Sequence, residues 1–234
     1  MACNFPGSTG QQDRVSGFWL GKMAGRPRFV LDQPQMSAFR EDMARYRARG
    51  YNGKELWLNP AVWAIAAYRL SNWLYLGRPS AIVRIPLKVV SFFAVKFCVV
   101  FMEMDIDPQA RIGGGFYVAH IGGVHINPGA VLGRNCDVAH RVTIGASAMG
   151  RQGIPVVGDE VYIGTGAVLV GKIKVGNGAK IAANTLVMSN VPAGATVMGV
   201  PGRIIMRAKP AAVAIATDAV AAEPVAVGAG VDAG

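Results

Sequence analysis

Cysteine is scarce in this sequence, and its spacing forms no recognisable site. Only three cysteines occur in 234 residues, at Cys3, Cys98 and Cys136. No two have the C-x-x-C spacing, which argues against a zinc knuckle and against a disulfide framework. The first twenty residues also lack the basic start and apolar core of a signal peptide. We therefore expect a protein of the reducing cytoplasm.

Aromatic and acidic residues are also few. Aromatics make up 8% of the chain, and 14 acidic residues face 24 basic ones, for a net charge of +10. Residues 36–103 carry ten Lys or Arg against four Asp or Glu. Such a balance suits an anionic substrate or an anionic membrane surface. No aromatics alternate with the basic residues and no nucleic-acid motif occurs, so nucleic acid is not an expected partner.

Composition divides the chain into four segments. Residues 1–35 are rich in Gly, Gln and Pro, and residues 207–234 are rich in Ala, Val and Gly. Neither has a periodic apolar face, so we expect both to be flexible. Residues 36–103 read as a small α-helical domain, with helices after Ser37, from Pro60 to about Leu76, and from Pro79 to about Met102. Residues 104–206 carry a different pattern.

The third predicted helix is unusually apolar. Residues 82–102 are hydrophobic enough to suggest a bilayer, but Arg84, Lys88 and Lys96 interrupt them and Pro86 would kink them. A charge at the centre of a membrane helix costs on the order of 3 kcal/mol on insertion scales. Packing within the protein's own oligomer is the favoured interpretation. A helix lying on a membrane surface and a true membrane span stay open as alternatives.

An aliphatic residue recurs at every sixth position of the last large segment. One set is Val157, Ile163, Leu169, Val175, Ile181 and Val187. An earlier set is Ile106, Ile112 and Val118, followed by Ile126, Leu132, Val138 and Ile144. A two-residue insertion near Val124 separates Val118 from Ile126, and a loop over 146–155 separates the two sets.

A period of six fits neither an α-helix nor a simple alternating strand. It fits a coil with three short flat faces, in which one aliphatic side chain per hexapeptide points inward. One coil cannot bury its own apolar face, so stacked neighbours must form the core. The pattern therefore predicts a left-handed parallel β-helix of hexapeptide repeats over about 106–204, preceded by the α-helical domain.

All three histidines fall within 21 residues, just before the long loop. His120 and His140 each follow an inward aliphatic by two positions, so we expect them to stack on one face, one coil apart. His125 lies in the insertion and reads as a surface or turn residue. A cluster of this kind favours at least one catalytic histidine.

Several stretches resemble the serine acetyltransferase family of hexapeptide acyltransferases. They are DIDPQARIGGGFYVAHIGG, VTIG, VVGDEVYIGTGAVLVGKIKVGNGAKIAANTLV and MGVPGRI, with AVWAIAAYRLSNWLY in the helical part. The resemblance covers roughly residues 38–206. It implies an acyltransferase that uses acetyl-CoA as co-substrate, forms trimers and needs no metal.

The resemblance also implies roles for particular residues. An Asp fifteen residues before a His orients that His as general base in the family, and Asp105 and His120 have this spacing. His140 is a further candidate catalytic residue. The implied cofactor-binding residues are Gly145 and Ala146 as oxyanion and pantetheine donors, Thr165 and Ala183 along a CoA groove between subunits, and Lys180 toward the CoA phosphates. Lys180 reads equally well as a solvated surface lysine.

Departures from the family pattern bear on the acceptor. Ala119 stands where the family has an Asp that helps to hold serine, and Gly153 and Ile154 stand where it has an Arg and a second active-site His. A zwitterion without charged partners is costly to desolvate. The stretches HIGGVHIN and GRQGIPVVGDEVYIG resemble a branch of the family found with polysaccharide assembly. We therefore expect a sugar hydroxyl as acceptor, on a glycan precursor at the inner membrane, with L-serine in cysteine biosynthesis as the alternative.

Two other readings belong to different classes. His120 and His125 form an H-x4-H spacing also seen in β-helical carbonic anhydrases, but a tetrahedral zinc site there needs a third imidazole, which only His140 could supply. Bound zinc would identify that class. The repeats could also serve only as a trimerisation scaffold, which failure to bind CoA would favour.

Overall fold

The computed structural model describes residues 35–77, 79–147 and 152–205. The two segments expected to be flexible, 1–35 and 207–234, lie outside these residues except for Gln35, which opens the first described helix. Residues 148–151 of the expected long loop also lie outside them.

The described helices precede all of the strands. They are α3 (Gln35–Ala48), α4 (Lys54–Leu58), α5 (Pro60–Leu76) and α6 (Ala81–Met102). Asn59 caps α5, because its side chain accepts a hydrogen bond of 3.0 Å from the Ala61 amide while Pro60 occupies the first helical position. The short helix α4 was not predicted from the sequence.

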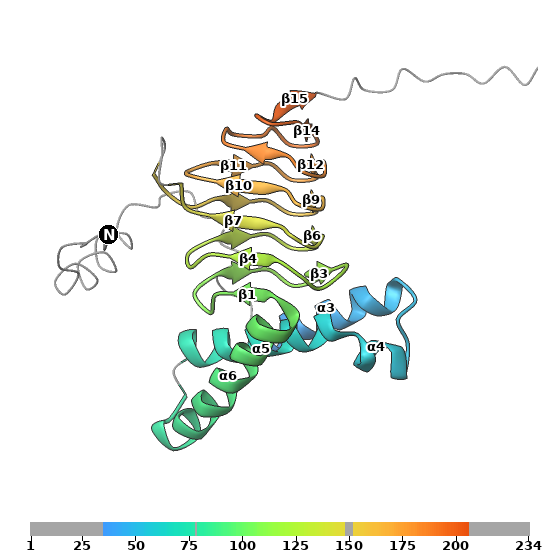
Figure 1. Ribbon diagram of the computed structural model, residues 1–234. Coiled ribbons are helices and arrows are strands. Elements are labelled where there is room, and N and C mark those ends of the chain that lie inside the picture. The colour runs from blue at the N-terminus through green and yellow to red at the C-terminus, as the bar shows by residue number, and fades with distance from the viewer. Residues whose placement is uncertain (1–34, 78, 148–151, 206–234) are drawn as a thin grey trace, which may run out of the picture.

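Fifteen short strands follow and stack into three sheets (Figure 1). Sheet A has the order β1-β4-β7-β10-β13, sheet B has β11-β8-β5-β2, and sheet C has β15-β14-β12-β9-β6-β3. All pairs are parallel except β14 with β15. The strands are β1 (Met104–Ile106), β2 (Arg111–Ile112), β3 (Tyr117–Val118), β4 (Val124–Ile126), β5 (Val131–Leu132), β6 (Asp137–Val138), β7 (Thr143–Gly145), β8 (Val156–Val157), β9 (Tyr162–Ile163), β10 (Val168–Val170), β11 (Lys174–Val175), β12 (Lys180–Ile181), β13 (Leu186–Val187), β14 (Thr196–Met198) and β15 (Arg203–Ile205).

The predicted aliphatic positions form the core of this prism. Every one of the thirteen is at most 5% exposed. Burying a side chain of this size stabilises the fold by roughly 1.5–3 kcal/mol. The small residues that follow them allow coils to approach closely: a Cβ built on Gly133 would lie 2.5 Å from the carbonyl carbon of Gly158 on the next coil. The predicted parallel β-helix behind a helical domain is confirmed.

A buried ion pair joins the helices to the first coils. Arg69 of α5 donates to both oxygens of Asp42 of α3, at 2.9 and 3.1 Å, and both side chains are almost fully buried. Arg69 also donates to the carbonyls of Ile112 and Gly113. The Phe116 amide donates to Asp42 at 2.8 Å. This network fixes α3 and α5 against the β1 end of the prism (Figure 1).

Two buried tyrosines add to this contact. The Tyr46 hydroxyl donates to the Val118 carbonyl at 2.9 Å, and the Tyr68 hydroxyl donates to the Ala110 carbonyl at the same distance. Burial raises the pKa of Tyr68 to about 12, so its phenol stays protonated and keeps donating at ordinary pH.

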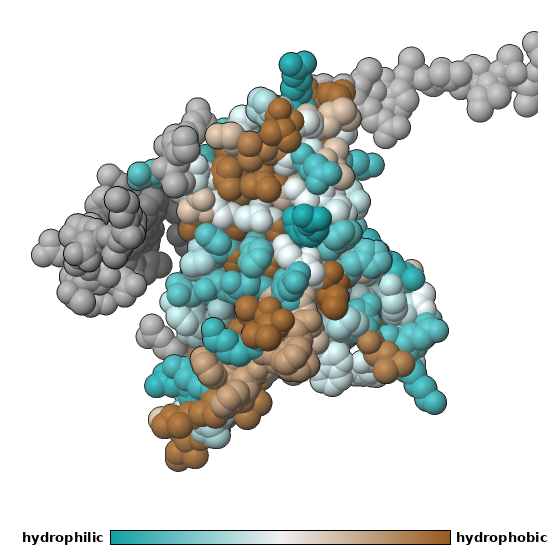
Figure 2. All heavy atoms as spheres, viewed as in Figure 1, coloured by the Kyte–Doolittle hydropathy of each residue, from teal (hydrophilic) through white to brown (hydrophobic). Residues whose placement is uncertain are grey.

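Helix α6 is packed much less completely than the other long helices. Only Ser91 and Cys98 are buried along its 22 residues. By length and composition it is the one helix in the described part of the chain that could cross a membrane. Figure 2 shows hydrophobic side chains gathered over it, at the end of the molecule that carries the helices.

We predict that Asp42→Ala destabilises the protein strongly. It leaves the Arg69 guanidinium buried without its carboxylate, and breaking a buried pair costs about 3–5 kcal/mol. Urea unfolding followed by circular dichroism measures the loss. The matched control is Arg134→Ala, which removes an ion pair of 2.8 Å between Arg134 and Glu41 on the surface and should cost at most about 1 kcal/mol. Equal losses for the two variants would contradict the importance of the buried network.

Candidate active site

One edge of the prism carries four of the predicted site residues in a column. The register pairs Val118 with Val138, Val138 with Ile163, and Ile163 with Ile181 across β3, β6, β9 and β12. The column residues each lie two positions beyond these strands, at the corner where the chain leaves sheet C for sheet A. They are His120, His140, Thr165 and Ala183. Two backbone hydrogen bonds connect the corners at His140, Thr165 and Ala183. The Gly166 amide donates to the His140 carbonyl, and the Asn184 amide donates to the Thr165 carbonyl.

The two histidines of this column contact each other. Their ring centroids lie 5.9 Å apart, with the rings inclined edge-to-face at 70°. The predicted stacking of His120 and His140 on one face is therefore present. His120 is exposed, whereas His140 is half-buried and its Nδ1 atom has no hydrogen-bond partner among the described residues. His120 is thus the imidazole that an external hydroxyl can reach.

The turn beside the histidines is unusually tight. Arg141 has a φ of 58°, a left-handed conformation that is uncommon for a residue with a side chain. Its amide donates to the Gly122 carbonyl at 2.8 Å. A Cβ on Gly123 would lie 3.1 Å from the Arg141 Cα, so this segment of the insertion lies directly against the His140 corner.

Asp105 contacts a different histidine from the one expected. Asp105 of β1 is in register with His125 of β4, and its Oδ2 lies 3.9 Å from His125 Nδ1. Both side chains are more than half exposed. Within the described ranges no hydrogen bond or ion pair joins Asp105 to His120. The register explains the pair: a coil of three hexapeptides plus two residues places His125, twenty positions on, beside Asp105, and His120 lies at the corner before that strand.

This Asp105–His125 pair was missed by sequence reasoning. His125 is exposed, in agreement with the prediction of a surface or turn residue, and it lies within β4. The signal that would have found the pair is the length of the enlarged coil. Thr143 of β7 continues the same register, so Asp105, His125 and Thr143 follow one another across sheet A.

The expected oxyanion donors lie on another edge of the same chain. Gly145 ends β7 and is buried, and Ala146 follows it and is exposed. This corner leads from sheet A to sheet B, whereas the histidine column lies between sheets C and A. One chain alone therefore does not bring Gly145 and Ala146 to His120.

Lys180 lies beside the column on the outer face of sheet C. It is exposed in β12, in register with Tyr162 and Thr196. It precedes Ala183 by three residues, so a ligand along the column edge would pass within reach of its long side chain.

Two residues that depart from the family pattern, Ala119 and Ile154, lie at different edges of the prism. Ala119 is half-exposed and immediately precedes His120. Ile154 packs beside Gly129, where a Cβ would lie 3.2 Å from the Ile154 Cδ1 atom. Ile154 therefore belongs to the corner between sheets A and B, apart from the His120 column of its own chain.

No group of three or more His, Cys, Asp or Glu side chains that could hold a metal occurs in the described ranges. His120 and His140 contact each other, while His125 faces Asp105.

Known proteins resemble this chain in both sequence and structure. It is 37% identical over 152 residues to a serine acetyltransferase of Mycobacterium tuberculosis, a match that covers 64% of this chain and 63% of the relative. It matches the structure of Neisseria gonorrhoeae serine acetyltransferase in complex with serine at a TM-score of 0.61 and 33% identity, covering 76% of this chain and 72% of that one. A serine acetyltransferase solved in complex with CoA matches at 0.58 and 26% identity, over 76% and 72%. No family model matches the chain.

A β-helix of stacked hexapeptides behind a small helical domain defines a hexapeptide-repeat protein. By its similarity to these relatives, the chain belongs to the serine acetyltransferase family. It spans between half and two thirds of the length of the curated relatives. The relatives named here are serine acetyltransferases, so the comparisons support the serine alternative better than the expected polysaccharide branch, which they do not show.

Proposed function

We propose that the protein is an O-acetyltransferase that moves an acetyl group from acetyl-CoA to an acceptor hydroxyl. The observation that carries the proposal is the column of His120, His140, Thr165 and Ala183 on one edge of a prism of the serine acetyltransferase family. A related structure contains CoA, which supports acetyl-CoA as the donor.

His120 is the proposed general base. Its exposed imidazole takes the proton of the acceptor hydroxyl while the hydroxyl oxygen attacks the thioester carbonyl carbon. The new C–O bond forms, the C–S bond breaks, and the imidazolium returns the proton to the leaving thiolate. A positioned base of this kind contributes about 10²–10⁴-fold to the rate. His140, edge-on at 5.9 Å, restricts the orientations open to the His120 ring.

Asp105 remains the proposed orienting residue, by resemblance to the family. Its present contact is with His125 at 3.9 Å, and both groups are exposed. Catalytic hydrogen bonds are often long without substrate and tighten only in the complex. We propose that Asp105 turns from His125 to His120 when the substrates bind, and that its charge then stabilises the imidazolium.

A trimer would complete the site. Gly145 and Ala146 lie on a different edge from the histidine column, so their proposed role as oxyanion donors needs a neighbouring subunit that brings its A–B edge beside this C–A edge. CoA would then lie in the groove between the two, along Thr165 and Ala183, with Lys180 toward its phosphates. Backbone N–H groups aimed at a developing oxyanion are among the largest contributions to catalysis.

L-serine is the acceptor that the names of the relatives favour. One matching structure, that from Neisseria gonorrhoeae, contains serine. A sugar hydroxyl is the second candidate, and Ala119 is the observation that favours it. Beside His120 this methyl group offers no charge to the serine ammonium, and an unpaired charge in a closing site is costly. A neutral sugar needs no such partner.

The first prediction about the activity concerns the acceptor. Purified protein is mixed with acetyl-CoA, and release of free CoA is followed with a thiol reagent in the presence of L-serine or of a panel of sugars and glycan precursors. Stimulation by L-serine at millimolar concentration establishes serine O-acetylation and excludes the sugar hypothesis. Stimulation only by a glycan acceptor establishes that the acceptor is a sugar hydroxyl, and that the replacement of the family's Asp by Ala119 accompanies the change from serine.

The second prediction concerns the base. With the better acceptor from that panel, His120→Ala should lower kcat by about 10²–10⁴-fold, because general-base assistance is lost. The matched control is His125→Ala, an exposed histidine on the adjacent sheet, which should change kcat by less than about tenfold. If His125→Ala is the more damaging variant, the Asp105–His125 pair is the catalytic one and the assignment to His120 is wrong.

The third prediction concerns the cofactor groove. Ala183→Trp places a large ring on the column edge and should weaken CoA binding at least about tenfold in calorimetry, because the edge is then filled. Ala193→Trp, at an alanine that is also exposed but lies on the edge between sheets B and C, should leave CoA affinity unchanged. Unchanged affinity for both variants would show that CoA binds elsewhere.

A further inference from the structure

Helix α6 leaves a large apolar stripe without a partner among the described residues. Ile82 is 88% exposed and Phe93 is 66% exposed. Side chains of this kind continue along most of the helix: Ile82, Val83, Ile85, Val89, Val90, Phe92, Phe93, Phe97, Val100 and Phe101. Apolar patches of this extent on a protein surface mark an interaction site.

The opposite side of α6 packs against the rest of the protein. Ser91 and Cys98, seven positions apart, are buried, and Ser91 Oγ lies 2.6 Å from Ser71 Oγ of α5. Residues seven apart share one face of an α-helix. Helix α6 is thus held against the protein by one narrow side, where Ala94, Val95 and Met102 also pack on the core, and its broad apolar stripe points away from the protein (Figure 2).

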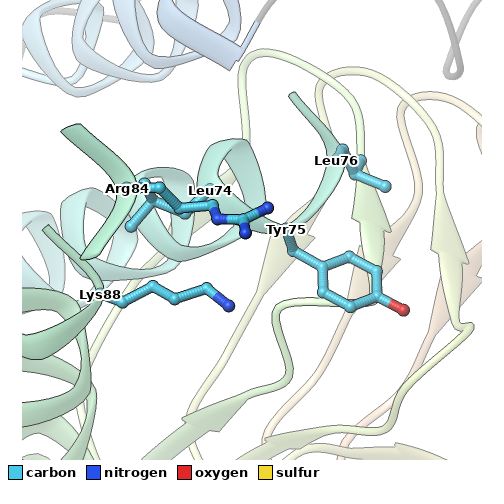
Figure 3. A pocket seen from close by; sticks show the side chains of 5 residues that line it. All are labelled: Leu74, Tyr75, Leu76, Arg84 and Lys88. Atoms are coloured by element: carbon cyan, nitrogen blue, oxygen red, sulfur yellow. The ribbon is translucent and has the colours of Figure 1, made fainter. Parts of the chain in front are cut away.

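The charge around this stripe has a single sign. No acidic residue occurs between Glu55 and Glu103, a span that contains five basic ones. Arg84 and Lys88, one turn apart on α6, line a pocket together with Leu74, Tyr75 and Leu76 at the end of α5. Figure 3 shows the two basic side chains extending in the same direction over this pocket. The pocket therefore offers two cations to an anionic group, beside an apolar surface.

These two features together fit the boundary of a lipid bilayer. At 1.5 Å per residue, α6 is about 33 Å long, enough to span, but a span would bury Arg84, Lys88 and Lys96 in hydrocarbon. A helix lying in the interface plane avoids that cost, because its apolar side enters the acyl region while its cations stay at the headgroups. Lys96, whose Nζ lies 5.8 Å from the Phe92 ring centre, has a stem long enough to reach the headgroup level.

We propose that α6 docks this protein on an anionic membrane surface, lying in the interface plane with its apolar stripe in the lipid and with Arg84 and Lys88 on a lipid phosphate. The proposal does not rest on the proposed enzymatic function. Membrane docking would nevertheless affect the position of the candidate active site, because α6 ends at Met102 and β1 begins at Met104. Docking holds the β1 end of the prism, with Asp105, close to the membrane surface.

The experiment is co-sedimentation of the purified full chain with vesicles. Vesicles containing phosphatidylglycerol and phosphatidylcholine should bind the protein at least tenfold more strongly than vesicles of phosphatidylcholine alone, and 0.5 M salt should reduce the binding. The double variant Val89→Glu/Phe93→Glu should lose at least tenfold in binding. The double variant Arg84→Ala/Lys88→Ala should lose about fivefold per cation on anionic vesicles, the size expected for a basic residue near an anionic surface.

The matched control is Met188→Glu, which adds one charge at an exposed apolar residue just after β13, at the far end of sheet A from β1. It should bind vesicles like the unaltered chain. If Val89→Glu/Phe93→Glu fails to fold, by circular dichroism, the Arg84→Ala/Lys88→Ala variant carries the test, because both residues already lie at the surface.

Two results would overturn the proposal. One is absence of binding to anionic vesicles by the unaltered chain. The other is a change of assembly size in analytical ultracentrifugation on Val89→Glu/Phe93→Glu with vesicle binding intact, which would assign the stripe to a second copy of this chain. Neither result bears on acetyl transfer, which the CoA-release assay measures without lipid.

Discussion

The stacking of one coil on the next is the constraint on which the rest of this structure depends. Each hexapeptide contributes one aliphatic side chain to the interior, and parallel strands about 4.8 Å apart bring successive coils into contact. Gly133 permits that approach, because a side chain there would meet the backbone of Gly158. A fixed rise per coil and a fixed register turn positions far apart in the sequence into columns along the edges. The candidate site is one such column.

A small change in coil length therefore has a large effect on which side chains meet. The coil that contains His120 is two residues longer than three hexapeptides, and the additional residues lie between Val118 and Ile126. A coil of three strict hexapeptides has 18 residues, whereas His120 and His125 lie 15 and 20 residues after Asp105, so strict repetition would place neither histidine beside it. In the structure the enlarged corner carries His120 toward His140, and the strand after it brings His125 within 3.9 Å of Asp105. The same insertion thus creates both histidine contacts.

Sequence reasoning succeeded where a single physical period governs the outcome. The thirteen inward aliphatics and the parallel prism follow from a repeat of six, the contact of His120 with His140 follows from their equal distance after the paired Val118 and Val138, and Asn59 with Pro60 marked the start of α5. It says less where side-chain direction decides. The family resemblance implies that Asp105 orients His120, and the structure places Asp105 beside His125, because spacing along the chain does not say how a corner turns. The Asp42–Arg69 network was equally invisible, since nothing local in either helix indicates that the two will be buried together.

The exposed face of α6 connects the packing problem with the choice of acceptor. A helix this apolar contributes most to stability when it is buried, yet only its narrow side around Ser91 and Cys98 is buried. The side left open carries no acidic residue, and Glu103 follows immediately with a left-handed φ of 52°. That sharp end ties the direction of α6 to β1, so whatever α6 binds is held at a defined angle to the prism. An acceptor carried on a lipid would then be presented to the catalytic edge by the membrane itself, and the chain would need fewer side chains to hold it. The small, uncharged Ala119 beside His120 suits such an acceptor, whereas the serine acetyltransferases that the chain resembles favour L-serine.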